Sequence, residues 1–258
     1  MGQIPLRPAA TIVVIREQND VLEILMLRRS SRAAAASGAH VFPGGGVDAA
    51  DTEVVRRQLG SGLGASSANR RLALEGGALH FYGAALRELF EEAGLLVAID
   101  RAGRPLDVTE ERRESWREDV SSGRLTWPDL LEREGLRLAW GEMRYWAHWV
   151  TPEGRPRRFD TRFFVAAAPP GQVARADGGE IVDLAWTSAS EALRRYETGQ
   201  WSMLVPTVHT LRVLASMRRV DEVMDFAARS PLPRTQPREI ERDGRLVVVL
   251  PGEPGYED

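Results

Sequence analysis

The sequence predicts one domain of mixed α/β (α+β) class. Runs of β-branched and aliphatic residues, such as Thr11–Arg16 and Val21–Leu27, predict buried strands. An apolar helical pattern over Leu79–Ala93 stops at a glycine, and no repeat, coiled coil or clean linker divides the chain. We therefore expect a single domain over residues 8–229, with residues 230–258 forming a tail that packs on it.

The first part of the chain is expected to form strands joined by turns. Gln18-Asn19-Asp20 separates the first two strands and has the composition of a turn. A further strand is expected to end at Val41-Phe42-Pro43, with a tight turn at Gly44–Gly46. Residues 52–79 are rich in glycine, alanine, serine and arginine, which predicts an inserted segment that is at most partly helical.

The rest of the chain alternates between predicted helices and strands. Trp127-Pro128-Asp129 has the proline of a helix N-terminus, and Gly94 has the position of a helix C-terminal glycine. Helices are expected at Thr109–Ser121, Trp127–Glu134, Ser190–Glu197 and Val205–Ala228. Strands are expected at Met143–Val150, Arg158–Ala167, Ile181–Trp186 and Leu246–Leu250.

The composition excludes several kinds of site. The chain has no cysteine, which rules out disulfides, thiolate nucleophiles and cysteine-ligated zinc. It has no lysine, so any anion site must use arginine guanidinium groups. The net charge of -3 gives no general reason to expect nucleic acid, and the apolar run Thr11–Ile15 is too short to cross a bilayer. We expect a cytoplasmic protein with no nucleic-acid or membrane partner, and a homodimer is compatible with the sequence.

Three glutamates on the predicted helix form its main chemical feature. At about 100° per residue, Glu88, Glu91 and Glu92 fall within one narrow sector, opposite a stripe of apolar side chains. Arg87 lies four residues before Glu91 and can pair with it. Converging carboxylates repel one another unless a cation lies among them, and Mg²⁺ or Mn²⁺ suits an all-oxygen site. A solvated acidic face is the alternative.

The glycine run and the glutamate helix together resemble the Nudix hydrolase superfamily. Its box has a glycine, five residues, a glutamate, seven residues, and then Arg-Glu-apolar-x-Glu-Glu-x-Gly-apolar. Residues 87–95 match the second half at every specified position, and Phe42–Gly46 resembles the first half. If Gly45 is the box glycine, Asp51 occupies the position of the first glutamate, and residues 52–79 interrupt the box.

This resemblance implies a fold and a chemistry. The implied fold is a Nudix α/β/α sandwich with a mixed β-sheet, extra helices at 52–79 and 98–135, and a helical C-terminal extension. The implied activity is metal-dependent cleavage of a phosphoanhydride bond. The resemblance makes Glu88, Glu91 and Glu92, with Gly45, the residues that hold Mg²⁺ or Mn²⁺; Glu88 is a ligand or the base. Arg87 is implied to support these glutamates.

The segment before the glycines resembles the extended motif of coenzyme A diphosphatases. The insertion in the box, together with segments such as Ser115–Arg117, Trp149–Pro152 and Arg157–Thr161, resembles the peroxisomal branch of that group. The positions that agree with that motif include Arg29, Ser30, Gly38 and Asp48. Two positions depart from it, because Leu27 replaces a threonine and Ala34 replaces an arginine. The resemblance implies coenzyme A or acyl-coenzyme A as substrate, with 3′,5′-ADP and (acyl-)4′-phosphopantetheine as products. The candidate substrate-binding residues are Arg29, Ser30, Gly44, Gly45 and Arg158.

One further glutamate and two competing functions stay open. Glu180 follows a glycine-containing loop, where Nudix folds often have a glutamate that assists metal binding or proton removal. The first alternative function is hydrolysis of another nucleoside diphosphate derivative, such as ADP-ribose, NADH or a dinucleoside polyphosphate. The second is a Nudix-fold module that binds a nucleotide without cleaving it. Trp146 and Trp149 are either core residues or stacking partners for a base.

Overall fold

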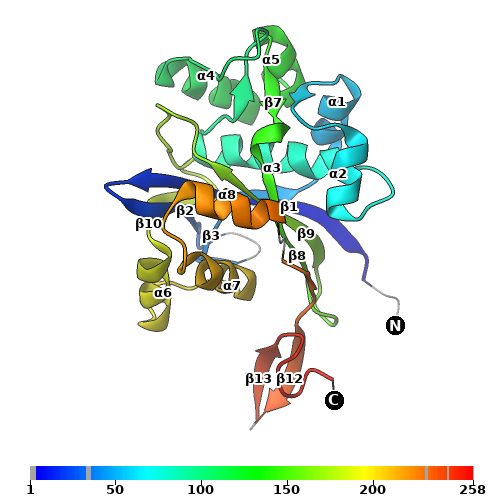
Figure 1. Cartoon of the computed structure of the whole chain (residues 1–258), viewed down its shortest axis with the longest axis vertical. Helices are drawn as coiled ribbons and strands as arrows, with labels where there is room; N and C mark the ends of the chain where they lie inside the picture. The colour runs from blue at the N-terminus through cyan, green and yellow to red at the C-terminus, as the bar shows by residue number, and fades with distance from the viewer. Residues whose placement is uncertain (1–3, 33–35, 230–231, 243, 258) are drawn as a thin grey trace.

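A mixed β-sheet forms the centre of the molecule in the computed structural model, which describes residues 4–32, 36–229, 232–242 and 244–257 (Figure 1). The strands of this sheet are β1 (Leu6–Gln18), β2 (Val21–Arg29), β3 (His40–Val41), β4 (Gly44–Gly46), β8 (Arg144–Val150), β9 (Arg158–Ala167), β10 (Ile181–Thr187) and β11 (Arg234–Thr235). Their order is β10-β2-β1-β9-β8-β11, with β3 paired to β2 and β4 paired to β1. The sheet is mixed because β1 runs parallel to β9 but antiparallel to β2.

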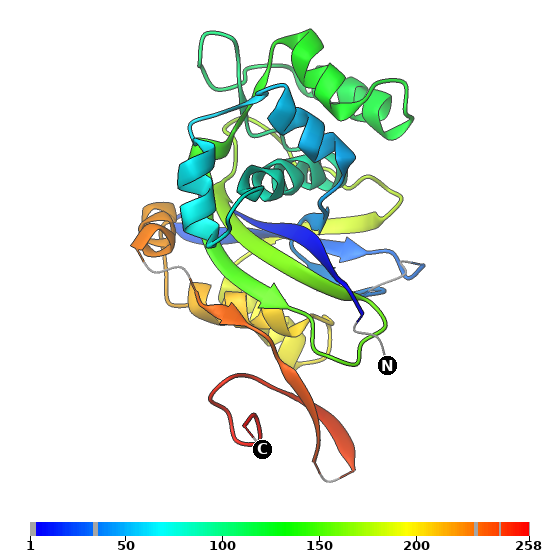
Figure 2. The same ribbon diagram turned by 90° about the vertical axis from the view of Figure 1, so that its right-hand side faces the viewer.

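Helices cover both faces of this sheet, so the predicted α/β/α sandwich is confirmed (Figure 2). One layer contains α1 (Ala49–Arg56), α2 (Ala65–Leu72), α3 (Ala78–Ala93), α4 (Glu110–Ser121) and α5 (Trp127–Glu134). The other layer contains α6 (Ala189–Glu197), α7 (Val205–Leu214) and α8 (Val220–Arg229). A small sheet of β5 (Gly60–Ser61), β7 (Arg137–Ala139) and β6 (Ala98–Ile99), with the short 3-10 helix Trp140–Glu142, lies in the first layer.

The central strands are buried on both faces. Along β1, Ile12 and Val14 pack toward α3, whereas Val13 and Ile15 pack toward the layer of α6 to α8. All four side chains are inaccessible to solvent. This is why the segment is a continuous apolar run instead of an alternating one.

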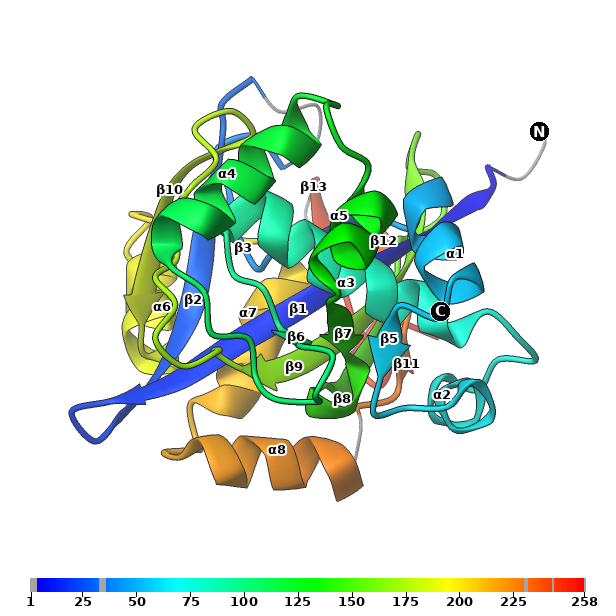
Figure 3. The same ribbon diagram turned by 90° about the horizontal axis from the view of Figure 1, so that it is seen from above.

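Helix α3 packs on β1 and is enclosed by its neighbours (Figure 3). Its C-terminal residue is followed by Gly94, whose φ of 67° is accessible to glycine at little cost and ends the helix. The sequence predicted one buried stripe, but only His80, Glu88 and Glu91 are partly exposed. The other helices of the layer cover the outer side of α3, which a single amphipathic pattern does not reveal.

The tight turn predicted at Gly44–Gly46 is wrong. These glycines form strand β4, which pairs with Ala9, Ala10 and Thr11 of β1. A Cβ on Gly44 would lie 2.8 Å from the Thr11 Cα, so the absence of a side chain permits this close approach. Gly44 therefore permits close contact between strands and does not turn the chain.

The inserted segment 52–79 is more ordered in structure than its composition predicted. It contains most of α1 and all of β5 and α2, and it buries Val54, Leu59, Ala68 and Leu72 in the core beside α3. The buried Arg162 of β9 donates through Nη1 to the Leu72 carbonyl at 2.7 Å. The insertion is thus part of the layer that covers the sheet.

The helix predicted over Val205–Ala228 is two helices, α7 and α8. The N–H of Val220, the first residue of α8, donates to the Glu17 carboxylate of β1 at 2.8 Å. This contact spans most of the chain, so the local sequence gave no signal for the break. Strand β11 then adds to the sheet edge at β8.

The tail after β11 forms a hairpin of β12 (Arg238–Arg242) and β13 (Arg245–Val249) that extends from the body of the molecule (Figures 1 and 2). An ion pair between Glu239 and Arg155 joins this hairpin to the loop between β8 and β9. None of the helices in the described ranges is long and apolar enough to span a bilayer.

Candidate active site

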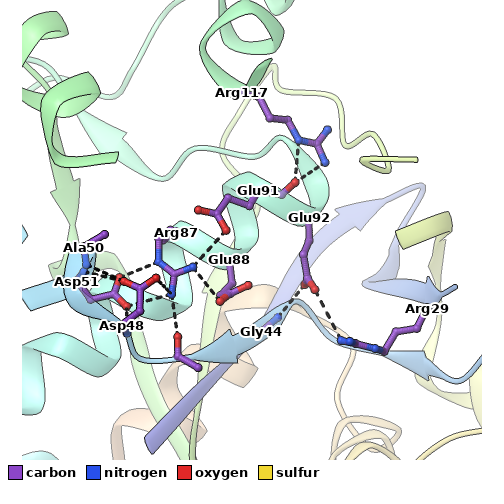
Figure 4. A network of polar contacts seen from close by, with 11 residues as sticks. Arg29, Gly44, Asp48, Ala50, Asp51, Arg87, Glu88, Glu91, Glu92 and Arg117 are labelled. Atoms are coloured by element: carbon purple, nitrogen blue, oxygen red, sulfur yellow. Dashed lines mark hydrogen bonds and ion pairs between the residues drawn. The ribbon is translucent and has the colours of Figure 1, made fainter. Parts of the chain in front are cut away.

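The second half of α3 lies over β4, and Arg87 forms hydrogen bonds with most of the polar groups there (Figure 4). Its side chain is 5% exposed, and every nitrogen of the guanidinium group has an acceptor. Nε donates to Asp51 at 3.0 Å, Nη2 donates to Asp51 at 3.0 Å and to the Gly46 carbonyl at 2.8 Å, and Nη1 donates to Glu88 at 2.9 Å and to Glu91 at 3.2 Å. Arg87 therefore joins three carboxylates to the glycine strand.

Asp51 connects the two halves of the interrupted motif. It is completely buried and receives the bidentate contact from Arg87 across 36 positions of sequence. Its position is fixed by the start of α1, where Asp48 and Asp51 form a capping box: the Asp48 N–H donates to Asp51 at 2.9 Å, and the Ala50 N–H donates to Asp48 at 2.7 Å. Local helix capping thus presents Asp51 to α3 despite the insertion that follows.

Glu92 is the most enclosed of the three glutamates, with 4% of its surface exposed. Its Oε2 accepts the Gly44 N–H at 2.9 Å, and its Oε1 lies 3.9 Å from the Arg29 guanidinium. Burial, with a further contribution from the charge of Glu88, raises the pKa of Glu92 well above its ordinary value. A buried carboxylate with so little compensating charge favours a proton or a cation.

Glu88 lies directly against the second glycine of β4. A Cβ on Gly45 would overlap the Glu88 carboxylate, so glycine is required there for that carboxylate to reach the strand. Burial raises the pKa of Glu88 to about 7, against the opposing effect of Arg87 and with a contribution from Glu91. Glu88 can therefore change its protonation state near neutral pH.

Glu91 is the most accessible member, with 34% of its side chain exposed. Its carboxylate contacts Arg87, as the helical spacing predicted. Its main-chain carbonyl accepts two hydrogen bonds from Arg117 of α4. Burial raises the pKa of Glu91 from its ordinary value, and Arg87 opposes that rise.

Arg29 connects Glu92 to the loop glutamate that the sequence singled out. The Arg29 guanidinium forms an ion pair with Glu180, and the Glu180 carbonyl accepts the Ser30 N–H at 2.7 Å. Half of the Glu180 side chain is exposed, so it lies at the rim of the group. The end of β2 thus carries both predicted residues, Arg29 and Ser30, to the same edge of the site, while Ala34 lies outside the described residues.

Other predicted residues lie elsewhere. In the described ranges no hydrogen bond or ion pair joins Arg158 to the glutamates; its Nε donates to the Thr151 carbonyl at 3.3 Å, near the start of β9. Trp146 and Trp149 are buried in the core under α6 to α8, so they form no exposed platform for a base. The sequence gave no role to Arg117, because its contact with α3 comes from the fold.

The donor set fits a hard divalent cation. Carboxylate oxygens of Glu88, Glu91 and Glu92 are available, and burial raises the pKa of each, so a bound cation would offset the cost of their buried charge. Within the part of the chain that the structure describes, no three acidic or histidine side chains already enclose a common point. Glu88 and Glu91 would have to turn from Arg87 toward an ion, and Glu92 is the carboxylate that Arg87 leaves free.

Comparison with known proteins agrees with this geometry. The NUDT19 Nudix domain family matches residues 66–214, which include the whole of α3. The chain belongs to this family. The matched region begins after Gly44–Gly46 and Asp51, so the first half of the motif rests on the contacts described above.

Individual relatives cover most of the chain. It is similar to the acyl-coenzyme A diphosphatase NUDT19 of Gallus gallus, with 28% identity over 91% of this chain and 72% of the relative. The acyl-coenzyme A diphosphatase NUDT19 of Homo sapiens is 28% identical over 90% of this chain and 72% of its own length. The crystal structure of a NUDIX hydrolase from Alicyclobacillus acidocaldarius superposes with a TM-score of 0.72 at 29% identity, covering 89% of this chain and all of that one. Both the Nudix fold and the hydrolase family are therefore assigned.

Proposed function

We propose that this protein is a Mg²⁺- or Mn²⁺-dependent diphosphatase that hydrolyses the diphosphate of coenzyme A or acyl-coenzyme A. The observation that carries the proposal is the buried Glu88 and Glu92 pair, held against the glycines of β4 beside Arg29. Such a site binds a cation and a phosphate group together. A module that only binds nucleotides has no chemical need for buried carboxylates with raised pKa values.

The substrate is supported by two independent features. Relatives that align over about nine-tenths of this chain are named acyl-coenzyme A diphosphatases. Arg29 and Ser30, from the motif that resembles coenzyme A diphosphatases, lie beside Glu92 and Glu180. A guanidinium group at this place matches the oxygens of a diphosphate.

The proposed reaction transfers a phosphoryl group to water. Water attacks one phosphorus of the diphosphate and forms a new P–O bond, while the bond from that phosphorus to the bridging oxygen breaks. The bridging oxygen stays on the other phosphate, which leaves, and a base takes the proton of the attacking water. The products are 3′,5′-ADP and 4′-phosphopantetheine or its acyl form. A bound divalent ion supplies charge neutralisation and acidifies water.

Each residue of the group has a proposed part. Glu92 and Glu91 would hold the cation, and Glu88 would be a further ligand or the group that accepts the proton. Arg87 fixes Glu88 and Glu91 and is itself fixed by Asp51. Arg29 orients the diphosphate, and Glu180 holds Arg29 or assists at the rim.

Product analysis tests the proposal. The pure protein is incubated with Mg²⁺ or Mn²⁺ and, separately, with coenzyme A, acetyl-coenzyme A, ADP-ribose, NADH or diadenosine tetraphosphate, and the products are identified by mass. We expect 3′,5′-ADP from both coenzyme A substrates, loss of that product in Glu92→Gln, and full activity in the control Glu118→Gln, whose side chain is exposed on α4.

Two outcomes would replace the proposal. Much faster cleavage of ADP-ribose or NADH than of coenzyme A would make the protein a hydrolase of another nucleoside diphosphate derivative. Survival of every compound with both metals would favour a module that binds nucleotides without cleaving them.

A further inference from the structure

Helix α4 places a buried arginine against the C-terminal end of α3. Arg117 is 6% exposed and comes from the segment between β6 and β7, far along the chain from the glutamates. Its Nε and Nη2 donate to the Glu91 carbonyl at 2.8 and 2.7 Å (Figure 4). Nε and Nη2 of Arg117 therefore both bind the helix turn that carries Glu91 and Glu92.

The Glu91 carbonyl is a special acceptor. It belongs to the last turn of α3, where carbonyls lack a partner within the helix and where the helix dipole is negative. A buried cation at this place satisfies the carbonyl and offsets the negative potential that acts on the two nearby carboxylates. Glu91 and Glu92 can then remain close together at the end of the helix.

The third guanidinium nitrogen of Arg117 contacts the loop that leads to Glu180. Its Nη1 donates to the Arg175 carbonyl at 2.9 Å. The same loop is attached at two further points. The Arg175 N–H donates to the carbonyl of Ala93, the last residue of α3, at 2.9 Å, and the Gln172 side-chain amide pairs with both the N–H and the carbonyl of Leu96 at 2.8 and 3.0 Å. Arg117 therefore contacts the helix end and this loop at once through hydrogen bonds of 2.7–2.9 Å.

We propose that Arg117 is a positioning residue for the hydrolytic site: it sets the distance between the turn carrying Glu91 and Glu92 and the loop ending at Glu180. This inference rests on the proposed function for its effect on catalysis. The proposed role requires the planar guanidinium group of Arg117, because a lysine keeps the charge but cannot bridge the Glu91 and Arg175 carbonyls with the same geometry. Arg113, its neighbour on α4, makes only longer contacts of 3.4 Å to Gly94 and Val173.

The test compares Arg117→Lys with Arg112→Lys on the same helix. Arg112 is exposed and pairs with Glu134, away from α3. Mn²⁺ affinity is measured by electron paramagnetic resonance of the free ion, without substrate. Amide hydrogen exchange is measured over residues 91–96 and 172–181, and kcat and KM are measured on the substrate that the unaltered protein cleaves.

We expect Arg117→Lys to weaken Mn²⁺ binding and to lower kcat by about 10-fold each, because residues that orient ligands typically have effects of that size. KM should stay within about twofold, since the substrate contacts are untouched. Exchange should accelerate in both segments and nowhere else, and Arg112→Lys should match the unaltered protein in every measurement.

The proposal is overturned if Arg117→Lys melts earlier but keeps its Mn²⁺ affinity and kcat, which is the result of a purely structural role. It is also overturned if Arg112→Lys gives the same losses, or if exchange over residues 172–181 does not change. Hydrogen exchange needs neither metal nor substrate. If the unaltered protein cleaves no diphosphate, the proposed function fails, and exchange alone then decides whether Arg117 holds the two segments.

Discussion

Removing the carboxylate of Asp51 should strongly destabilise the protein. Asp51 is completely buried and receives two hydrogen bonds of 3.0 Å from Arg87. Loss of one partner from a buried ion pair typically costs about 3–5 kcal/mol, because the remaining charge is then poorly compensated in the interior. Without the Asp51 carboxylate, Arg87 would keep only its contacts with Glu88, Glu91 and the Gly46 carbonyl. For a domain of this size, 1 kcal/mol corresponds to about 2–4 °C, so Asp51→Asn should lower the melting temperature by roughly 6–20 °C.

A double-mutant cycle distinguishes this pair from a general loss of packing. Asp51→Asn, Arg87→Met and the double variant are unfolded in urea and followed by circular dichroism. The double variant should lose about 2 kcal/mol less than the sum of the two single losses, because the contact between Asp51 and Arg87 is then lost only once. Glu53→Gln, which removes two ion pairs near the surface of the same helix α1, should change the melting temperature far less. Additive losses, or equal effects of Glu53→Gln and Asp51→Asn, would refute the account of how the interrupted motif is joined.

Three further outcomes are expected. Glu92→Gln should abolish Mn²⁺ binding, measured by titration calorimetry, and lower kcat by about 100-fold or more. It should not lower the melting temperature, because it removes a buried charge. Glu88 should contribute a fall of up to roughly 3 kcal/mol in the stability of the metal-free protein as pH rises from 4.5 to about 7, since folded Glu88 holds its proton more tightly than the unfolded chain does. Urea unfolding at several pH values should show a smaller fall in Glu88→Gln than in the unaltered protein, and an equal fall would contradict this. Gly45→Ala should weaken Mn²⁺ binding because its methyl group displaces the Glu88 carboxylate, whereas Gly46→Ala, where a Cβ meets nothing within 4 Å, should bind Mn²⁺ as the unaltered protein does.

Elements whose signals are local were predicted from the sequence. Helix α3 was predicted from its apolar spacing, and its end was predicted from Gly94, which has a φ of 67° in the structure. Strand β9 has the predicted bounds Arg158–Ala167. The same applies to the contact of Arg87 with Glu91, which needs only the helical repeat. The pattern of charges on one helix therefore located the candidate site.

Features that depend on distant contacts were not predicted. The glycines of β4 resemble a turn in isolation, and only their pairing with β1 makes them a strand. At the start of α8 the Val220 N–H is bound by Glu17, and at the end of α3 the Glu91 carbonyl is bound by Arg117. In each case a distant part of the chain, either a paired strand or a side chain, satisfies a backbone group, which local propensity does not encode.

The placement of a divalent ion is the most direct test of the site. Crystals grown with Mn²⁺ and measured at the manganese absorption edge would show an anomalous peak at each bound ion. The account predicts a peak in contact with the carboxylate oxygens of Glu92 and Glu91, close to Glu88 and Gly45, with Arg87 still paired to Asp51. A fully occupied peak elsewhere, with these carboxylates still hydrogen-bonded to Gly44 and Arg87, would contradict it.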